Sequence, residues 1–153
     1  NVYETELAIY ITAASVSDVA LDCRFTRDNF ATVIDAAAAY RWGVAFAVPG
    51  VGYDGGVGAS DTRMRLVRSG SNGGLNTAPA AVISARIRAH GLSARQKGIH
   101  ASGNYVNAVG NLTNLLSASG ILLASPATDP VNGLRLFPAS GTITGRVDIL
   151  IRR

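Results

Sequence analysis

Apolar and polar residues alternate with a period of two along most of this chain. The clearest case is AVISARIRAH, residues 81–90, where Ala81, Ile83, Ala85 and Ile87 alternate with Val82, Ser84, Arg86 and Arg88. Similar alternation marks residues 3–11, 40–48, 61–67, 131–137 and 144–151. Because successive side chains of a strand point to opposite faces, this pattern predicts β-strands with one face buried and the other exposed.

Glycine-rich polar segments separate these predicted strands. Residues 49–61 and 69–79 resemble long loops, and the dipeptide Ser-Gly recurs at four positions along the chain. Short strands at frequent intervals with such turns are typical of sandwiches and barrels. We therefore predict an all-β fold in which residues 1–153 form a single antiparallel β-sandwich domain with a jelly-roll-like arrangement.

Two segments compete with this interpretation. Residues 29–42, NFATVIDAAAAYRW, are rich in alanine and compatible with a helix, but we interpret them as a loop that leads into a strand. Residues 107–123, NAVGNLTNLLSASGILL, carry leucines spaced for one helical turn, and the pattern leaves helix and strand both open.

The last predicted strands lie in NGLRLFPASGTITGRVDILIRR, residues 132–153. We expect a closing hairpin whose turn is Ser140-Gly141, because glycine can adopt the positive φ that such turns need. Gly145 suits a bulge or a close backbone approach. Tyr40 and Trp42 lie within one predicted strand, and we expect both to anchor the core between two sheets.

Composition argues for a covered surface. The chain is 48% hydrophobic and only 16% charged, so we expect part of its surface to be covered by other copies, with a homotrimer as the expected state. No apolar run reaches the roughly 18 residues of a membrane span, so we expect no membrane insertion. The chain starts at Asn1 without a methionine, and we expect it to have been trimmed or cut from a longer one.

The sequence offers no clear catalytic motif. Its one cysteine, Cys23, lies on the predicted buried face of VALDCRFT, which indicates an inert thiol. The two histidines, His90 and His100, belong to no nucleophile or metal motif. We therefore predict a protein that is not an enzyme and that has no metal site and no cofactor.

Acidic residues give no carboxylate pair either. Asp54 and Asp61 flank a glycine-rich segment that superficially resembles a calcium loop, but the alternating acids and final glutamate of such a loop are missing. Glu4 and Glu6 share the outward face of a first strand that resembles an edge strand, where solvation explains them.

The net charge of +4 comes almost entirely from arginine. Three pairs of cations have i, i+2 spacing, and they would form one basic stripe if their strands were neighbours: Arg63 and Arg65, Arg86 and Arg88, Arg95 and Lys97. Such a stripe would bind phosphate backbones or acidic sugars. The alternative is a solvated face paired with acids of a neighbouring strand or subunit. No exposed aromatic residues interleave with the arginines to stack bases, so we favour the alternative and expect no nucleic-acid partner.

The order of several short motifs resembles a known family. These motifs are LDCRFTRDNFATVIDAAAAYRWGVAF, then TRMRLV, AVISARIRAHG and NGLRLFPASGTITGRVDILI. Together they resemble the small β-sandwich domain of tailed-bacteriophage and prophage virion proteins, in which residues 26–29 would form a turn, Tyr40 to Trp42 a strand and Leu134 to Leu150 the closing hairpin. The end of the chain, LIRR, departs from the family's usual ending, and the turn lacks the family's double glycine.

The resemblance implies a non-enzymatic virion protein on the tail or capsid surface, assembled in the host cytoplasm and bound to other virion proteins. A fibre, spike or tail-tip module that binds a host-surface glycan is our leading hypothesis. A capsid decoration or head-fibre protein with a purely structural role and a free carbohydrate-binding module are the alternatives. Loops carry function on rigid sandwiches, so the candidate glycan contacts are the polar and aromatic residues of segments 49–61, 69–79 and 91–104: Tyr53, Asn72, Asn76, His100, Asn104 and Tyr105.

Overall fold

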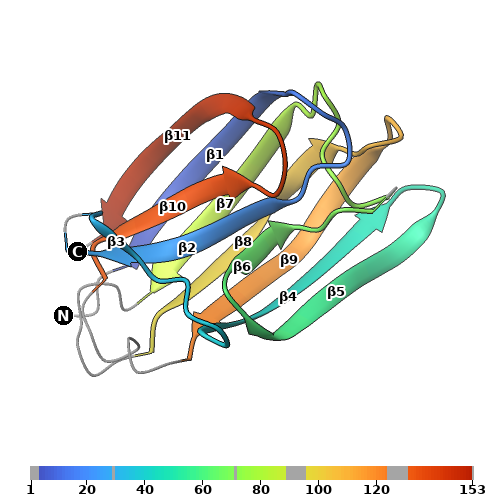
Figure 1. Ribbon diagram of the computed structural model, residues 1–153. Coiled ribbons are helices and arrows are strands. Elements are labelled where there is room, and N and C mark those ends of the chain that lie inside the picture. Colours follow the sequence, from blue (N-terminus) through green and yellow to red (C-terminus); the bar gives the residue numbers. More distant parts are fainter. Residues whose placement is uncertain (1–3, 29, 71, 89–95, 124–130, 153) are drawn as a thin grey trace.

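The computed structural model describes residues 4–28, 30–70, 72–88, 96–123 and 131–152. Within these residues the protein is all-β, with two antiparallel sheets packed face to face (Figure 1). The predicted β-sandwich is therefore confirmed. The part of the chain that the structure describes contains no helix able to cross a membrane.

The larger sheet has seven strands in the order β11-β1-β7-β8-β9-β4-β5. Their bounds are β1 (Glu4–Ala14), β4 (Tyr40–Val48), β5 (Gly52–Asp61), β7 (Ala81–Arg88), β8 (Gly98–Val106), β9 (Leu112–Leu122) and β11 (Ile143–Arg152). The smaller sheet is built on β2 (Leu21–Arg27), which pairs with β10 (Gly133–Pro138) on one edge and with β3 (Thr32–Val33) and β6 (Met64–Val67) on the other.

Strand pairing is nested along the chain. β1 pairs with β11, β2 with β10, β4 with β9 and β7 with β8. A chain that folds back on itself in this way and then rolls into two sheets has a jelly-roll-like arrangement. The start of β1 and the end of β11 consequently lie side by side, with Glu4 opposite Arg152 (Figure 1).

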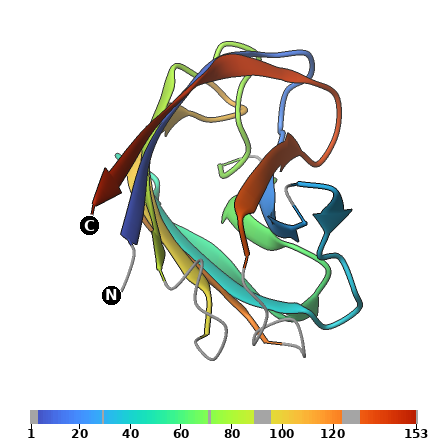
Figure 2. The same cartoon turned by 90° about the vertical axis from the view of Figure 1, so that its left-hand side faces the viewer.

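The core lies between the sheets and consists of the apolar face that the alternation predicted. In β7, for example, Ala81, Ile83, Ala85 and Ile87 are buried while the residues between them are exposed. Because four strands cover only the middle of a seven-stranded sheet, β11 and β5 project beyond the covering sheet (Figure 1). Figure 2 shows the two sheets facing each other from a second side.

Tyr40 connects the two sheets inside this core. Its hydroxyl donates to the backbone carbonyl of Ile34 (2.7 Å) and accepts from the backbone N–H of Phe25 in β2 (3.1 Å). The ring is fully buried, and burial raises the pKa of Tyr40. A buried hydroxyl with both of its hydrogen bonds satisfied fixes how the sheets lie on each other. The predicted core role of Tyr40 is confirmed, whereas Trp42 is only partly buried.

Cys23 lies in the same core, as predicted. It is fully buried, and burial, with a smaller contribution from the charge of Asp22, raises the pKa of its thiol. The thiolate is the reactive form of cysteine, so this residue is an inert packing group.

The expected closing hairpin is wrong. β10 and β11 are consecutive, but β10 pairs with β2 in the small sheet and β11 pairs with β1 in the large one. The Ser140-Gly141 segment therefore crosses from one sheet to the other. Gly141 does adopt a positive φ of 65°, so its turn character was predicted correctly even though the partners were not.

Some other predictions made from the sequence are confirmed, and others are wrong. Residues 29–42 contain the short β3 and a loop into β4 in their described part, as interpreted, and most of the open segment 107–123 is strand β9. The prediction that residues 49–61 form a loop is wrong, because most of them form strand β5, which makes a hairpin with β4. The first strand is not an edge, since β1 lies between β11 and β7. The predicted first strand began at residue 3, which lies outside the described residues.

Gly145 occupies a position where no side chain fits. It lies opposite Ile11, next to an irregularity in the β1–β11 register, and a Cβ there would come within 1.9 Å of the Tyr10 carbonyl oxygen. The predicted close backbone approach is confirmed.

We expect Gly145→Ala to lower the free energy of unfolding by about 1–3 kcal/mol, because the added methyl group must displace a strand backbone. Gly43→Ala is the matched control: its added Cβ would have 3.9 Å to the nearest side chain, and we expect a change within about 0.5 kcal/mol. Urea unfolding followed by circular dichroism measures both. Equal losses in the two variants would contradict the close-approach argument.

At the other end of the large sheet, Asp61 holds Trp42. The indole N–H donates to Asp61 Oδ2 (3.0 Å) and the backbone N–H of Thr62 donates to Oδ1 (2.7 Å). Partial burial acts to raise the pKa of Asp61, but these hydrogen bonds and the charges of Arg63 and Arg65 outweigh it, so the pKa is lowered.

A lowered folded-state pKa means that the carboxylate stabilises the fold above the ordinary carboxyl pKa of about 3.9 and loses this effect as the pH falls through the lowered value. We therefore expect Asp61→Asn to reduce the free energy of unfolding at pH 6, with the difference from wild type vanishing in strong acid. Trp42 is the only tryptophan, so its fluorescence during urea unfolding reports the change. An equal loss at both pH values would show that charge plays no part.

Candidate functional site

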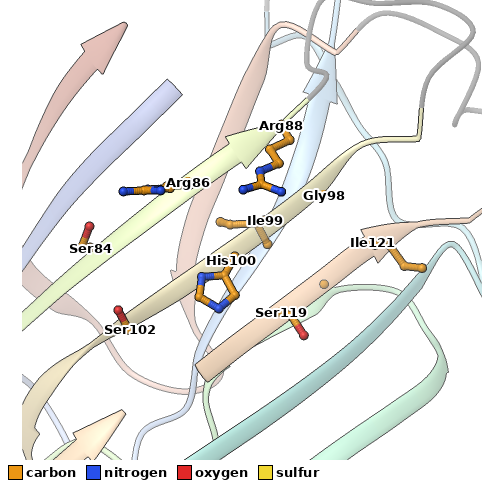
Figure 3. Close-up of a pocket in the computed structure, with 10 residues that line it drawn as sticks. Ser84, Arg86, Arg88, Gly98, Ile99, His100, Ser102, Ser119 and Ile121 are labelled. Carbon is orange, nitrogen blue, oxygen red and sulfur yellow. The ribbon is translucent and has the colours of Figure 1, made fainter. Parts of the chain in front are cut away.

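A polar trough lies on the outer face of the large sheet, across β7, β8 and β9 (Figure 3). Its volume is about 500 Å³. The lining consists of hydroxyl, cationic and imidazole side chains around two glycines, with isoleucine beside them: Ser84, Arg86, Arg88, Gly98, Ile99, His100, Ser102, Ser119, Gly120 and Ile121. It is more polar than the two other hollows described below, and hence it is our candidate site.

Strand register places these side chains in rows. Arg86 lies opposite His100, and His100 opposite Ser119, so these three form one row across the sheet. In the next row Gly98 stands between Arg88 and Ile121. Because glycine has no side chain, the centre of the second row is empty, and this gap forms the hollow.

Two acids of β1 balance the arginines of the trough. The Arg86 Nε atom lies 3.0 Å from Glu6 Oε1 and 3.7 Å from Glu4 Oε1, and Arg88 Nε lies 3.6 Å from Glu4 Oε2. For Arg86 and Arg88, these contacts confirm the favoured alternative to a basic stripe, in which the arginines pair with acids of a neighbouring strand. They also keep the trough close to electrically neutral while holding both guanidinium groups in place.

The described residues do not form the basic stripe of six cations. Arg65 belongs to β6 of the smaller sheet and Arg63 directly precedes that strand; they pair with buried Asp22 at 3.3 Å (Arg63) and 2.9 Å (Arg65). Lys97 is fully buried, and Arg95, like His90, lies outside the described residues. The shared i, i+2 spacing of these cations in the sequence therefore did not indicate that their strands are neighbours in one sheet.

A second hollow continues the trough toward β5. It has a volume of about 430 Å³ and shares Ser119, Gly120 and Ile121 with the first, while Arg41 and Val57 lie on its other side. The two hollows together form what we call the outer groove, which runs from β7 to β5. Its length suits an extended ligand better than a single small molecule.

The outer groove offers both donors and acceptors of hydrogen bonds. Serine hydroxyls do both, the guanidinium groups only donate, and a neutral imidazole such as that of His100 has one nitrogen that donates and one that accepts. The His100 Nε2 atom lies 3.4 Å from Ser117 Oγ, which orients the ring along the sheet. Ligands with many hydroxyl groups match such a mixture, and rigid strands hold it in fixed geometry.

Of the six residues predicted to contact a glycan, His100 alone lines the outer groove. Asn104 is exposed on the same face of β8, two residues after Ser102 and outside the lining of the groove. Tyr53 is 84% exposed on β5, beyond the lining of the groove. These three share a sheet face but do not converge.

The other three predicted residues have structural roles. Tyr105 is buried and donates from its hydroxyl to the Gly73 carbonyl (2.6 Å), so its assignment to a ligand-binding loop is wrong. The Asn76 amide nitrogen donates to the Asn107 carbonyl (3.1 Å), and its oxygen accepts from the backbone of residue 78. The carbonyl of Asn72 accepts from the side chain of Asn107 (3.2 Å). Together they fix the 72–80 connection against the end of β8.

Three serines of the groove were missed by sequence reasoning. Ser84, Ser102 and Ser119 face outward, and the strict alternation around Ser84 was the available signal. The candidate residues came instead from segments that resemble loops. The carboxylates of the segment that superficially resembles a calcium loop have partners in the protein: Asp54 contacts Arg68 (3.3 Å), and Asp61 accepts a hydrogen bond from Trp42. The described residues contain no group of three or more potential metal ligands.

Comparisons of this chain with protein-family models, curated proteins and solved structures found no match. The resemblance to phage virion sandwiches therefore stays a prediction that depends on the motifs quoted above. What supports a function is the geometry of the outer groove and of the sheet that carries it.

Proposed function

We propose that this protein is a non-enzymatic glycan-binding module of a tailed-bacteriophage particle, in which the outer groove holds a polysaccharide of the host surface. The observation that carries the proposal is the groove itself: an extended surface with serine hydroxyls, an imidazole and the guanidinium groups of Arg41, Arg86 and Arg88, of which the last two are paired with Glu4 and Glu6. The virion assignment comes from the motif resemblance.

Charge balance narrows the ligand class. A basic groove would favour phosphate backbones, but here Glu4 and Glu6 compensate Arg86 and Arg88. Sugars that carry mainly hydroxyl groups fit this arrangement, because each hydroxyl both donates and accepts. An attached carboxylate could still accept from Arg88, whose side chain is 67% exposed.

The proposal predicts a loss of binding for the double variant Arg88→Ala/His100→Ala. Hydrogen bonds to charged groups contribute about 1.5–3 kcal/mol each, so we expect at least about a tenfold weaker affinity. A glycan array would first identify a bound sugar, and calorimetry would then compare affinities. Tyr53→Ala is the control, because Tyr53 lies on the same face but outside the lining.

Three outcomes would contradict parts of the proposal. Wild-type protein that binds no sugar would support the purely structural decoration role. Equal losses in the Tyr53 control would place the binding surface elsewhere on the sheet. Release of new reducing ends from a bound polysaccharide would show an enzyme. Mass spectrometry of purified particles tests the virion assignment separately, since a free carbohydrate-binding module would be absent from them.

A further inference from the structure

β11 is an edge strand with features that favour addition of another strand. Each strand pair that β11 makes in the described part of the chain is with β1. In an antiparallel ladder half of the backbone N–H and C=O groups of an edge strand point away from its neighbour, so β11 presents a row of such groups along its free side.

Compared with β11, the outer strands β10, β3 and β5 each have a feature that hinders the addition of another strand. β10 is short and ends in Pro138, and β3 has only two residues. In β5 both backbone groups of Gly55 are bonded by side chains of the chain itself, the N–H to Asp54 and the carbonyl to Arg68. β11 has ten residues without lysine or proline, and proteins that stay monomeric usually avoid such edges.

Both faces of β11 carry exposed aliphatic side chains. Ile149 is 63% exposed, Leu150 59% and Val147 42%. Val147 and Ile149 also line a mostly apolar cleft of about 490 Å³ between β11 and β10, on the side where the sandwich is open. A strand added beside β11 would therefore bury these side chains and close the mouth of the cleft.

The charges of β11 identify the added strand. Arg146 is exposed and Asp148 is half-exposed, and the two side chains lie on the same face, 3.0 Å apart. Two copies of β11 related by a twofold axis perpendicular to the sheet pair antiparallel, with residues of the same face opposite each other. Centring this pairing on Val147 places Arg146 opposite Asp148 of the second copy, twice. Centring it on Asp148 would place two carboxylates opposite each other.

We propose that a second copy of this chain docks on β11, antiparallel and centred on Val147, so that the two seven-stranded sheets become one continuous sheet. This register uses residues 143–151 of the strand, nearly its whole length, and it satisfies both charge pairs. The state is a dimer, in place of the trimer expected from sparse charge. The inference does not depend on glycan binding, because β11 contributes no residue to the lining of the outer groove and β1 separates it from β7.

Charge reversal tests the proposal. Light scattering or sedimentation of the full chain should give the mass of a dimer at micromolar concentration. We expect Arg146→Asp and Asp148→Arg each to weaken dimerisation by at least about tenfold, because both place like charges opposite each other. An equimolar mixture of the two variants should restore the dimer, as should the double variant that exchanges both charges. Neither side chain is buried, and circular dichroism checks that each variant is folded.

Disulfide trapping tests the register. Directly opposite residues have Cα atoms about 4.5–5.5 Å apart, within the range that a disulfide spans. Val147→Cys should therefore crosslink to itself across the twofold axis under mild oxidation. Ile149→Cys is the control, because its counterpart lies four residues along the strand, about 13 Å away. The native Cys23 is buried and does not interfere.

A monomer at all concentrations, a trimer, a dimer unaffected by both charge reversals, or crosslinking of Ile149→Cys in place of Val147→Cys would each overturn the proposal. A monomer that still binds a sugar would refute this inference alone, and a dimer that binds none would refute the proposed function alone.

Discussion

Burial of one face of a seven-stranded sheet beneath a sheet of only four strands is the constraint on which the rest of this structure depends. The covered middle forms the core, where Tyr40 reaches from β4 to the backbone of β2. The uncovered ends behave differently. At β5 the exposed end is closed by polar contacts between Trp42, Asp61 and Thr62, whereas at β11 aliphatic side chains remain exposed. The unequal size of the two sheets thus leaves two uncovered ends with different contacts: β5 is tied to β4 by a polar cluster, and β11 borders an apolar cleft that faces β10.

The alternation of apolar residues was sufficient to predict the fold class and most of the buried faces. It reports which side of a strand is buried, and in β7 it did so at each position. It carries no information about which strands are neighbours. For that reason the sequence was compatible with one stripe of Arg63, Arg65, Arg86 and Arg88. In the structure, the first two pair with Asp22 of the smaller sheet. For the same reason the short turn at Ser140-Gly141 was interpreted as a hairpin.

The candidate site was less accessible to sequence reasoning than the fold. Its residues come from three strands that are adjacent only after β7, β8 and β9 have paired, and glycine at position 98 creates the hollow by lacking a side chain. Polar aromatic residues in apparent loops were a poor guide, because Tyr105 uses its hydroxyl to hold the backbone at Gly73 inside the core. The strand β5 was missed because its glycines and acids hide the alternation that a strand usually shows.

Nested pairing also has a consequence for how the protein reaches its native state. β7, β8 and β9 can assemble from adjacent segments of chain, but β1 meets β11, and β2 meets β10, only when almost the whole sequence has left the ribosome. Closing such large loops is slow, and folding rates fall as contacts become more distant in sequence. Until β11 has been synthesised, β1 is itself a temporary edge, so the larger sheet of a nascent chain stays incomplete while the strands between them are made.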